Sequence, residues 1–327
     1  MFDSMHGSGF ESINRGYNQV FRPRRLSLGL VAPVEAYPTS AVPSMRQHLE
    51  RIQRAEALGF DAVWLRDVPF NVPSFGDAGQ VYDPFVYLGM LAAGTERIAL
   101  GVSSIVLPLR HPAHVAKAAA SADALSGGRL ILGIASGDRP DEYPALKLPY
   151  EDRGERFRAA YDYIRAMQET AAEFDNAYGR PYGGMDMLPK PVAGKLPILI
   201  TGGSQQDPDW IARHGDGWML YPRNPALQVQ IIAQWRERIA AAGRPDQPVM
   251  QPLYIDLVED AGARPQAIHL GFRCGADFLG DHLQHLQAIG VNHVALNLRF
   301  NRADIPATLE RLAEEILPEF SHPDTSD

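Results

Sequence analysis

Polar side chains collect directly after the apolar runs of this sequence, at the points where buried strands would end. These positions are Glu35, Arg66-Asp67, Ser103-Ser104 with His111, Ser136 to Glu142, Gly202 to Gln206, Tyr221 to Asn224, and Asn297 with Arg299. Hydroxyl groups, guanidinium groups and the backbone N–H groups of glycine-rich turns are the donors that bind phosphate. The pattern therefore predicts a site for an anionic ligand that is built from several loops.

Two of these loops are candidate phosphate sites. The first contains Gly202, Gly203, Ser204 and Gln205, and it stands before a helix that opens with Asp207-Pro208. Its glycines let backbone N–H groups approach an anion, and the helix N-terminus adds positive potential. The second is the loop with the residues Ser136, Gly137, Asp138 and Arg139. Arg139 could hold a phosphate or pair with Asp141 or Glu142 on the surface, and both loops could be plain turns.

Arg66, Asp67 and His111 are the candidate catalytic residues. Asp67 could accept a hydrogen bond from a ligand while Arg66 offsets negative charge on it, or the two could form an ion pair with each other. His111 could donate a proton or cap the helix that begins at Pro112. Three further residues could bind an anionic substrate, namely Tyr221, Arg223 and Arg299.

Several other chemistries lack their residues here. The histidines are scattered without metal-ligand spacing, so no metal site is predicted. There is no G-x-S-x-G nucleophile motif, and no lysine stands at a strand end as the Schiff base of an aldolase would. The net charge of −8 argues against nucleic-acid binding, and Cys274 is the single cysteine. With no signal peptide and no membrane-length apolar run, we expect a cytoplasmic protein.

Strands and helices alternate along the chain. Buried strands are predicted over 26–32, 60–65, 98–107, 129–135, 196–200, 217–221, 249–258 and 291–298. Helices are predicted over 42–58, 83–94, 111–126, 153–175, 224–242, 274–289 and 305–317, and a short one begins at 207. The simplest account is an α/β fold, the (β/α)8 or TIM barrel. An open doubly wound sheet is the alternative, but the dinucleotide fingerprint is absent after the first strand.

We expect one barrel domain over 26–320, an N-terminal extension over 1–25 and a tail over 321–327. Two irregular stretches interrupt the pattern, the loop 68–82 and an insertion over 176–195 after the fourth helix of the barrel. Long loops in compact domains are often functional, so we expect both to cover the site and exclude water.

The stretch TERIALGVSSIVLPLRHPAHVAKAAASADALSGGRLILGIASGD, followed by Glu142-Tyr143 and RGERF, resembles the bacterial luciferase-like monooxygenase family. The later segments PILITGGS and IARHGDGWM are similar to the fifth and sixth strands of that family. The likeness covers roughly 26–243 and continues more weakly through the eighth strand. It is closest to the flavin-type subgroup in which Arg-Asp-Val-Pro follows the second strand.

The resemblance implies a TIM barrel that binds reduced FMN or, in some branches, the deazaflavin F420. It implies a non-prolyl cis peptide at Ser103-Ser104 that supports the flavin ring. It places the phosphate at Ser136 and its loop and at Gly203, Ser204 and Gln205. Many monooxygenases of the family carry a catalytic His after the second strand, where this chain has Arg66-Asp67-Val68.

The resulting hypothesis is a flavin-dependent oxidoreductase that oxygenates a small organic substrate with reduced FMN and O2. We expect a separate flavin reductase to supply the reduced FMN and the chain to form a homodimer. One alternative is F420-dependent hydride transfer. A second is a flavin-binding protein without turnover, which the missing His favours. A phosphosugar isomerase or aldolase on the same barrel is a weaker alternative.

Overall fold

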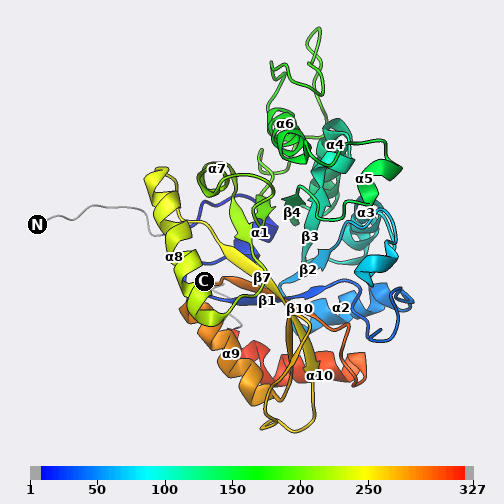
Figure 1. Cartoon of the computed structure of the whole chain (residues 1–327), viewed down its shortest axis with the longest axis vertical. Coiled ribbons are helices and arrows are strands. Elements are labelled where there is room, and N and C mark those ends of the chain that lie inside the picture. The colour runs from blue at the N-terminus through cyan, green and yellow to red at the C-terminus, as the bar shows by residue number, and fades with distance from the viewer. Residues whose placement is uncertain (1–8, 321–327) are drawn as a thin grey trace, which may run out of the picture.

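The computed structural model describes residues 9–320, and the strands within this range form a closed parallel barrel (Figure 1). Strands β1 to β7 lie side by side in chain order, and β10 pairs with both β7 and β1 to close the ring. The predicted tail 321–327 and the first eight residues of the predicted extension lie outside the described residues. The barrel strands are β1 (Ser27–Val31), β2 (Ala62–Leu65), β3 (Ala99–Val106), β4 (Leu130–Ala135), β5 (Ile198–Thr201), β6 (Gly217–Met219), β7 (Val249–Leu257) and β10 (His293–Asn297).

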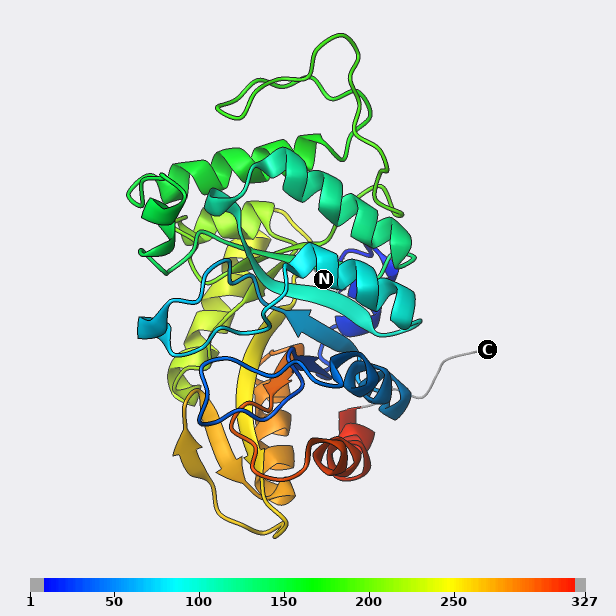
Figure 2. The same ribbon diagram turned by 90° about the vertical axis from the view of Figure 1, so that its right-hand side faces the viewer.

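Helices surround the barrel, and the predicted TIM barrel is confirmed (Figures 1 and 2). They are α1 (Arg15–Val20), α2 (His48–Leu58), α3 (Pro84–Gly94), α4 (Pro112–Leu125), α5 (Glu142–Ala145), α6 (Arg153–Ala166), α7 (Pro208–His214), α8 (Pro225–Ala241), α9 (Ala276–Ala288), α10 (Ile305–Glu315) and α11 (Leu317–Phe320). The side chains of Asp83, Asp207 and Asn224 accept N–H bonds from the first turns of α3, α7 and α8. An acid or amide before a first-turn proline therefore starts each of these helices.

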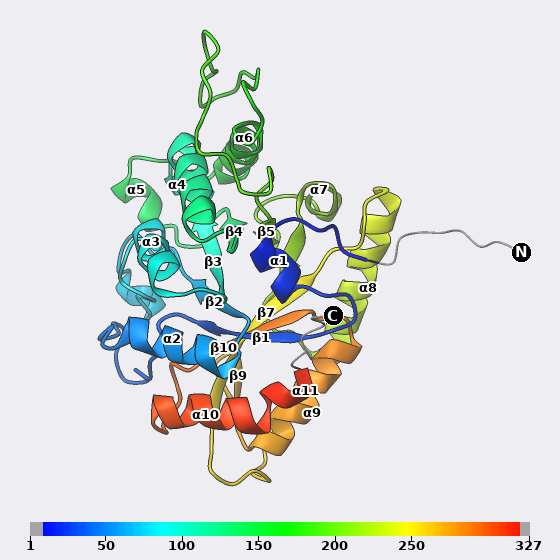
Figure 3. The ribbon, with the colours of Figure 1, turned by 180° about the vertical axis from the view of Figure 1, so that it is seen from behind.

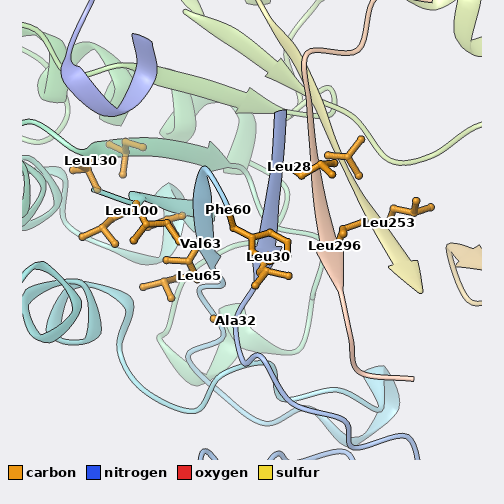
Figure 4. Close-up of a cluster of buried hydrophobic side chains, with 14 of the residues drawn as sticks. Leu28, Leu30, Ala32, Phe60, Val63, Leu65, Leu100, Leu130, Leu253 and Leu296 are labelled. Atoms are coloured by element: carbon orange, nitrogen blue, oxygen red, sulfur yellow. The ribbon is translucent and has the colours of Figure 1, made fainter. Parts of the chain in front are cut away.

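The core has two layers. Outward-facing side chains of the strands, such as Leu28, Val63 and Leu100, pack under the helices (Figure 4). Inward-facing side chains fill the barrel, where Trp64 donates an indole N–H bond of 2.8 Å to Nε2 of the buried His293. A Cβ at Gly101 would lie 2.2 Å from the Trp64 ring, so only glycine leaves room for this indole.

The N-terminal segment closes one end of the barrel, as Figure 3 shows for α1. Ile13, Tyr17, Val20 and Phe21 are buried in the same cluster as the barrel interior. The Tyr17 hydroxyl donates to the Asp216 carbonyl oxygen at 2.7 Å. Because α1 lies against the N-terminal halves of β3 and β4, it covers the end opposite to the strand ends that carry the polar loops.

Two helix boundaries were predicted wrongly. The helix expected from 42 begins at His48, because the Glu35 carboxylate accepts the N–H groups of Ser44 and Met45 and holds this segment as a turn. The helix expected to reach 175 ends at Ala166, after which the Lys190 ammonium group binds the Met167 carbonyl oxygen. At the first boundary Met45 and Gln47 also adopt left-handed backbone conformations, which a continuous helix does not allow. At the second, the Met167 carbonyl oxygen is one that a longer helix would have used.

A small hairpin was missed altogether. Strands β8 (Gln266–Ile268) and β9 (Gly271–Cys274) are antiparallel to each other, and β9 adds to β7 in parallel register. Cys274 ends β9, and the helix expected from that residue begins at Ala276. A Cβ at Gly271 would lie 1.8 Å from the Tyr254 carbonyl oxygen, so the glycine permits this close approach.

The insertion over 176–195 does not cover the predicted site. It projects from the outer side of α4 and α6 (Figure 2). Its backbone is held to α4 by the Asp123 carboxylate, which accepts the Val192 N–H at 2.8 Å. Several of its large apolar side chains are exposed, among them Tyr182 and Met185. The expectation that this insertion shields the site from water is therefore wrong.

Candidate active site

A cavity of about 530 Å³ lies at the carboxyl ends of the strands and gathers most of the predicted site residues. β3 contributes Ser103 and Ser104 to its wall, β4 and β5 contribute their last residues, and β7 contributes Tyr254. The predicted residues that line it are Arg66, Asp67, Ser103, Ser104, Ser136, Gly137, Arg139, Gly202, Ser204, Gln205, Tyr221 and Arg299. The structure therefore joins loops that are far apart in the sequence into one site, at the end where TIM barrels bind their ligands.

The turn after β5 has the shape of an anion site. Gly202, Ser204 and Gln205 all adopt left-handed backbone conformations, and all three line the cavity. Turns of this kind direct successive N–H groups toward one side, where an anion can bind. The turn is braced by the Trp218 indole, which donates to the Gly202 carbonyl oxygen at 2.8 Å. It is also packed against Gly154, where a Cβ would lie 2.8 Å from the Gln205 Cβ.

The loop after β4 forms the facing wall. Gly137 has a left-handed backbone, and a Cβ there would lie 2.7 Å from a Val106 methyl group, so a side chain would be excluded. The Tyr143 hydroxyl donates to the Ser136 carbonyl oxygen at 2.5 Å and fixes this loop. With these contacts in place, the two candidate phosphate loops together line one cavity.

The neighbouring strand β3 contains the peptide bond that joins Ser103 and Ser104, and this bond is cis, as the family resemblance implied. It coincides with a shift of register between β3 and β4, from Val102 to Ile105. The Ser104 hydroxyl is bonded to that of Thr201 across the barrel mouth. This bulge presents backbone and hydroxyl groups to the cavity and gives a planar ligand a polar surface to lie on.

Asp67 is not paired with Arg66. Its side chain is 1% exposed, and its two carboxylate oxygens accept bonds of 2.7 and 3.0 Å from the Arg110 guanidinium group. One of the same oxygens also accepts the Val106 N–H at 3.1 Å. Asp67 therefore ties the end of β2 to the end of β3, and its carboxylate is saturated with hydrogen bonds.

Arg66 instead belongs to a network around Asp77, from the loop 68–82. The Asp77 carboxylate accepts hydrogen bonds from Arg66 at 2.7 Å and from the Tyr37 hydroxyl at 3.1 Å, and it forms an ion pair with Arg299 at 2.9 Å. Burial alone would raise the pKa of Asp77, but the two guanidinium groups and the Gly79 N–H hold it below its ordinary value. This network fastens the loop over the cavity.

Arg139 and Glu142 face each other inside the wall. The Arg139 guanidinium lies 4.5 Å from the centroid of the Phe75 ring, and its Nη1 is 4.0 Å from Oε1 of Glu142. Both side chains are at least nine-tenths buried, so this pair is not on the surface as one prediction had it. Within residues 9–320 neither Arg139 Nη1 nor Glu142 Oε1 has a hydrogen-bond partner. A bound ligand can satisfy both atoms.

Three predicted residues do not line the cavity. Nδ1 of His111 accepts the Ala113 N–H at 3.2 Å, so this ring caps α4, which was the structural alternative for it. Gly203, which belongs to the anion turn, and Arg223 are likewise not among the residues that line the cavity. Within residues 9–320 the His111 ring contacts the rings of His114, Tyr163 and Tyr178, none of which lines the cavity.

The cavity also contains residues that the sequence did not single out. They include Asp77, Tyr254, His269 and Leu270, whereas Asp138 and Glu142, which also line it, were named only as members of the loop after the fourth strand. His269 and Leu270 form the tip of the missed β8–β9 hairpin. The centroid of the His269 ring lies 5.4 Å from the centroid of the Tyr254 ring. The segment 266–274 reads QAIHLGFRC and contains no continuous apolar run, so the rule that marked the other strands did not mark this hairpin. Glu142 had a stronger signal, because it stands in the loop after a predicted barrel strand.

The chain matches the sequence model of the luciferase-like monooxygenase family over residues 26–277. An uncharacterized protein of Mycobacterium tuberculosis, Rv0953c, is 33% identical over 203 residues, which is 59% of this chain and 71% of that protein. A pyrimidine monooxygenase, RutA of a Bradyrhizobium species, is 31% identical over 62% of this chain and 58% of its own. An F420-dependent glucose-6-phosphate dehydrogenase of Intrasporangium calvum is 32% identical over 53% of each chain.

Solved structures show the same fold. The monooxygenase RslO1 from Streptomyces bottropensis superimposes with a TM-score of 0.75 at 20% identity, over 90% of this chain and 100% of its own. An F420-dependent secondary alcohol dehydrogenase superimposes with a TM-score of 0.74 at 19% identity, over 91% of this chain and 100% of its own. The oxygenating component of a diketocamphane monooxygenase from Pseudomonas putida was solved with FMN. It superimposes with a TM-score of 0.70 at 14% identity, over 91% of this chain and 100% of its own.

Proposed function

Since this chain belongs to the luciferase-like monooxygenase family, and is an oxidoreductase of that kind, we propose that it binds reduced FMN in the cavity described above. In this proposal the enzyme uses O2 to oxygenate a small organic substrate. The observation that carries it is the cavity itself, in which a left-handed turn, a serine-rich bulge and a buried guanidinium group converge. These donors fit a ligand that has one phosphate and one planar ring.

The residues divide into those for the phosphate and those for the ring. Ser204, Gln205 and the loop with Ser136 would hold the phosphate, while Ser103 and Ser104 would lie under the ring. The flavin supplies the redox chemistry when it is bound. The chain contributes orientation, and its loop over the cavity, which is fastened at Asp77, excludes water from the reacting groups.

Arg66 and Arg299 would act on the ligand through their positive charge rather than as proton donors. Each keeps one contact to Asp77, and both line the cavity. Two guanidinium groups that share one carboxylate leave a net positive charge near the ligand, which favours a reduced, anionic ring or an anionic substrate. Tyr221 and His269 are the candidate substrate contacts at the same mouth.

The test is the absorption spectrum of the protein after incubation with FMN and desalting. Wild-type protein should retain FMN, and Ser204→Asp should lose it because a carboxylate repels the phosphate by roughly 1–3 kcal/mol, about 5- to 150-fold in affinity. Ser204→Ala is the matched control, since it removes the hydroxyl without adding charge. No binding to the wild type, or equal binding to Ser204→Asp, would contradict the proposal.

F420-dependent hydride transfer is the second candidate. It is favoured by the F420-dependent relatives and by the absence of a His after β2, where Asp67 is locked to Arg110. The two candidates differ in oxygen consumption. Oxygen uptake with reduced FMN supports the first, whereas a substrate-dependent change in F420 absorbance without oxygen uptake supports the second. Retention of flavin without turnover of any substrate would support the binding-protein alternative.

We also propose a cytoplasmic homodimer that receives reduced FMN from a separate reductase. In the described part of the chain no helix is both long enough and apolar enough to span a bilayer. Helix α3 has apolar side chains on its outer face, where Val86 is 73% exposed and Met90 is partly exposed. Val86→Asp should therefore yield monomers in light scattering, whereas Leu125→Asp, an exposed site on α4, should not.

A further inference from the structure

Most ionisable side chains of the cavity are already committed to partners. Asp67 is bonded to Arg110, and Asp77 is bonded to Arg66 and Arg299, in each case at 2.7 to 3.0 Å. A carboxylate held by two strong donors is a poor base, because protonation would break those bonds. Neither aspartate is therefore suited to exchange a proton with a ligand.

Glu142 is different in both position and bonding. It stands at the start of α5, lines the cavity and is 2% exposed. Within the described residues its Oε1 has no hydrogen-bond partner, and the nearest cation, Nη1 of Arg139, is 4.0 Å away and also unpartnered. Both atoms are almost fully covered, so a ligand atom or a water molecule would contact the two together from the cavity side after a small shift of these side chains.

The charges around this carboxyl come from three elements. Arg139 and Asp138 belong to the loop before α5, Asp67 lies at the end of β2 with Arg110 beside it, and the Phe70 N–H belongs to the loop over the cavity. Burial raises the pKa of Glu142 to about 7, Arg139 opposes this rise, and the negative charges of Asp67 and Asp138 add to it. A carboxyl with this pKa can both give and take a proton at neutral pH.

We propose that Glu142 is the acid–base residue of this cavity, and that it transfers a proton between Oε1 and an oxygen or nitrogen atom of the molecule bound beside it. This inference rests on the proposed function, because the molecule is the cofactor or substrate of that reaction. When Glu142 acts as the acid, its O–H bond breaks and the proton bonds to the ligand atom. The electron pair stays on the carboxylate, next to the Arg139 guanidinium, and solvent at the cavity mouth restores the proton.

Arg139 is a positioning residue in this proposal. Its guanidinium stabilises the carboxylate form of Glu142 and is itself held by the Phe75 ring and by the Asp77 carbonyl oxygen at 3.5 Å. Removing its charge should therefore make Glu142 a weaker acid without removing the acid. This effect separates the electrostatic role of Arg139 from a merely structural one.

The first experiment needs no cofactor. Infrared spectra of the ligand-free chain, recorded from about pH 5 to 9 with labelled glutamate, should show a protonated carboxyl band that disappears near neutral pH. The band should be absent in Glu142→Gln, and in Arg139→Gln it should persist to higher pH. Glu151→Gln, an exposed carboxyl of the following loop, should leave the band unchanged.

The second experiment is the pH profile of turnover with the cofactor that the wild type retains. Glu142→Gln should lower kcat by about 10²- to 10⁴-fold and remove the limb near neutral pH, and Glu142→Asp should restore part of the rate with a shifted limb. A near-neutral band that survives in Glu142→Gln, or an unchanged pH profile, would overturn the assignment of Glu142. Loss of cofactor binding by the wild type would instead overturn the proposed function, so the two failures are distinguishable.

Discussion

Replacing Glu142 by Gln should stabilise the ligand-free protein, and the gain should grow with pH. Burial raises the pKa of this carboxyl in the folded chain from 4.5 to about 7, while Arg139 opposes the rise. Because the pKa of an acid is raised on folding, ionisation costs stability in the folded state. This cost is absent below the unfolded pKa, accumulates between the two pKa values and is complete above the folded one.

The size of the effect follows from the shift. Each pKa unit corresponds to about 1.4 kcal/mol, so the difference between 4.5 and about 7 gives an upper bound of about 3.5 kcal/mol for the full cost. Water that reaches the carboxylate through the cavity lowers this cost, and we expect roughly 2 kcal/mol. Much of it should develop between about pH 5.5 and 8.

Urea unfolding of the ligand-free protein measures this directly. The free energy of unfolding of wild type and Glu142→Gln should diverge by roughly 1–2 kcal/mol as the pH rises from about 5.5 to 8. Glu151→Gln should give a curve parallel to that of the wild type, because its carboxyl is exposed. Parallel curves for Glu142→Gln and wild type would refute the reasoning, since they would mean that Glu142 ionises as readily in the folded chain as in the unfolded one.

Two further substitutions test the contacts that hold the loops of the site in place. Asp67→Asn should lower the free energy of unfolding by about 2–4 kcal/mol, because it leaves the half-buried Arg110 guanidinium without its main partner. Glu310→Gln removes an exposed ion pair and should cost less than about 1 kcal/mol in the same urea titration, so equal losses would contradict the burial argument. Gly154→Ala should weaken FMN binding by about 10-fold or more, since its Cβ would displace Gln205 in the anion turn; unchanged retention of FMN would show that this turn does not hold the phosphate.

Much of the scaffold could be predicted because its signals are local. Apolar runs marked the strands, and an acid or amide before Pro marked the starts of α3, α7 and α8. The polar residues after the strands could be assigned to one site without any coordinates. In a parallel barrel all these residues emerge at the same end, as the lining of the cavity confirms.

The roles of individual residues depended on partners that are distant in the chain. The sequence neighbours Arg66 and Asp67 could have formed an ion pair with each other. In the structure Arg66 is instead paired with Asp77, and Asp67 with Arg110. The helix expected from 42 was shortened in the same way, by the Glu35 carboxylate. Local spacing carries no information on which charge will lie nearest in space, so it could not decide these cases.

For Glu142, too, the sequence determined the position of the residue and the tertiary structure determined its surroundings. The sequence alone determined that a carboxyl follows the fourth barrel strand and would stand at the ligand end of the fold. Only the tertiary structure decided that this carboxyl is buried, that its Oε1 faces Arg139 at 4.0 Å and that Asp67 lies nearby. Acidity is set by desolvation and by charges from every direction, and these exist only once the chain has folded.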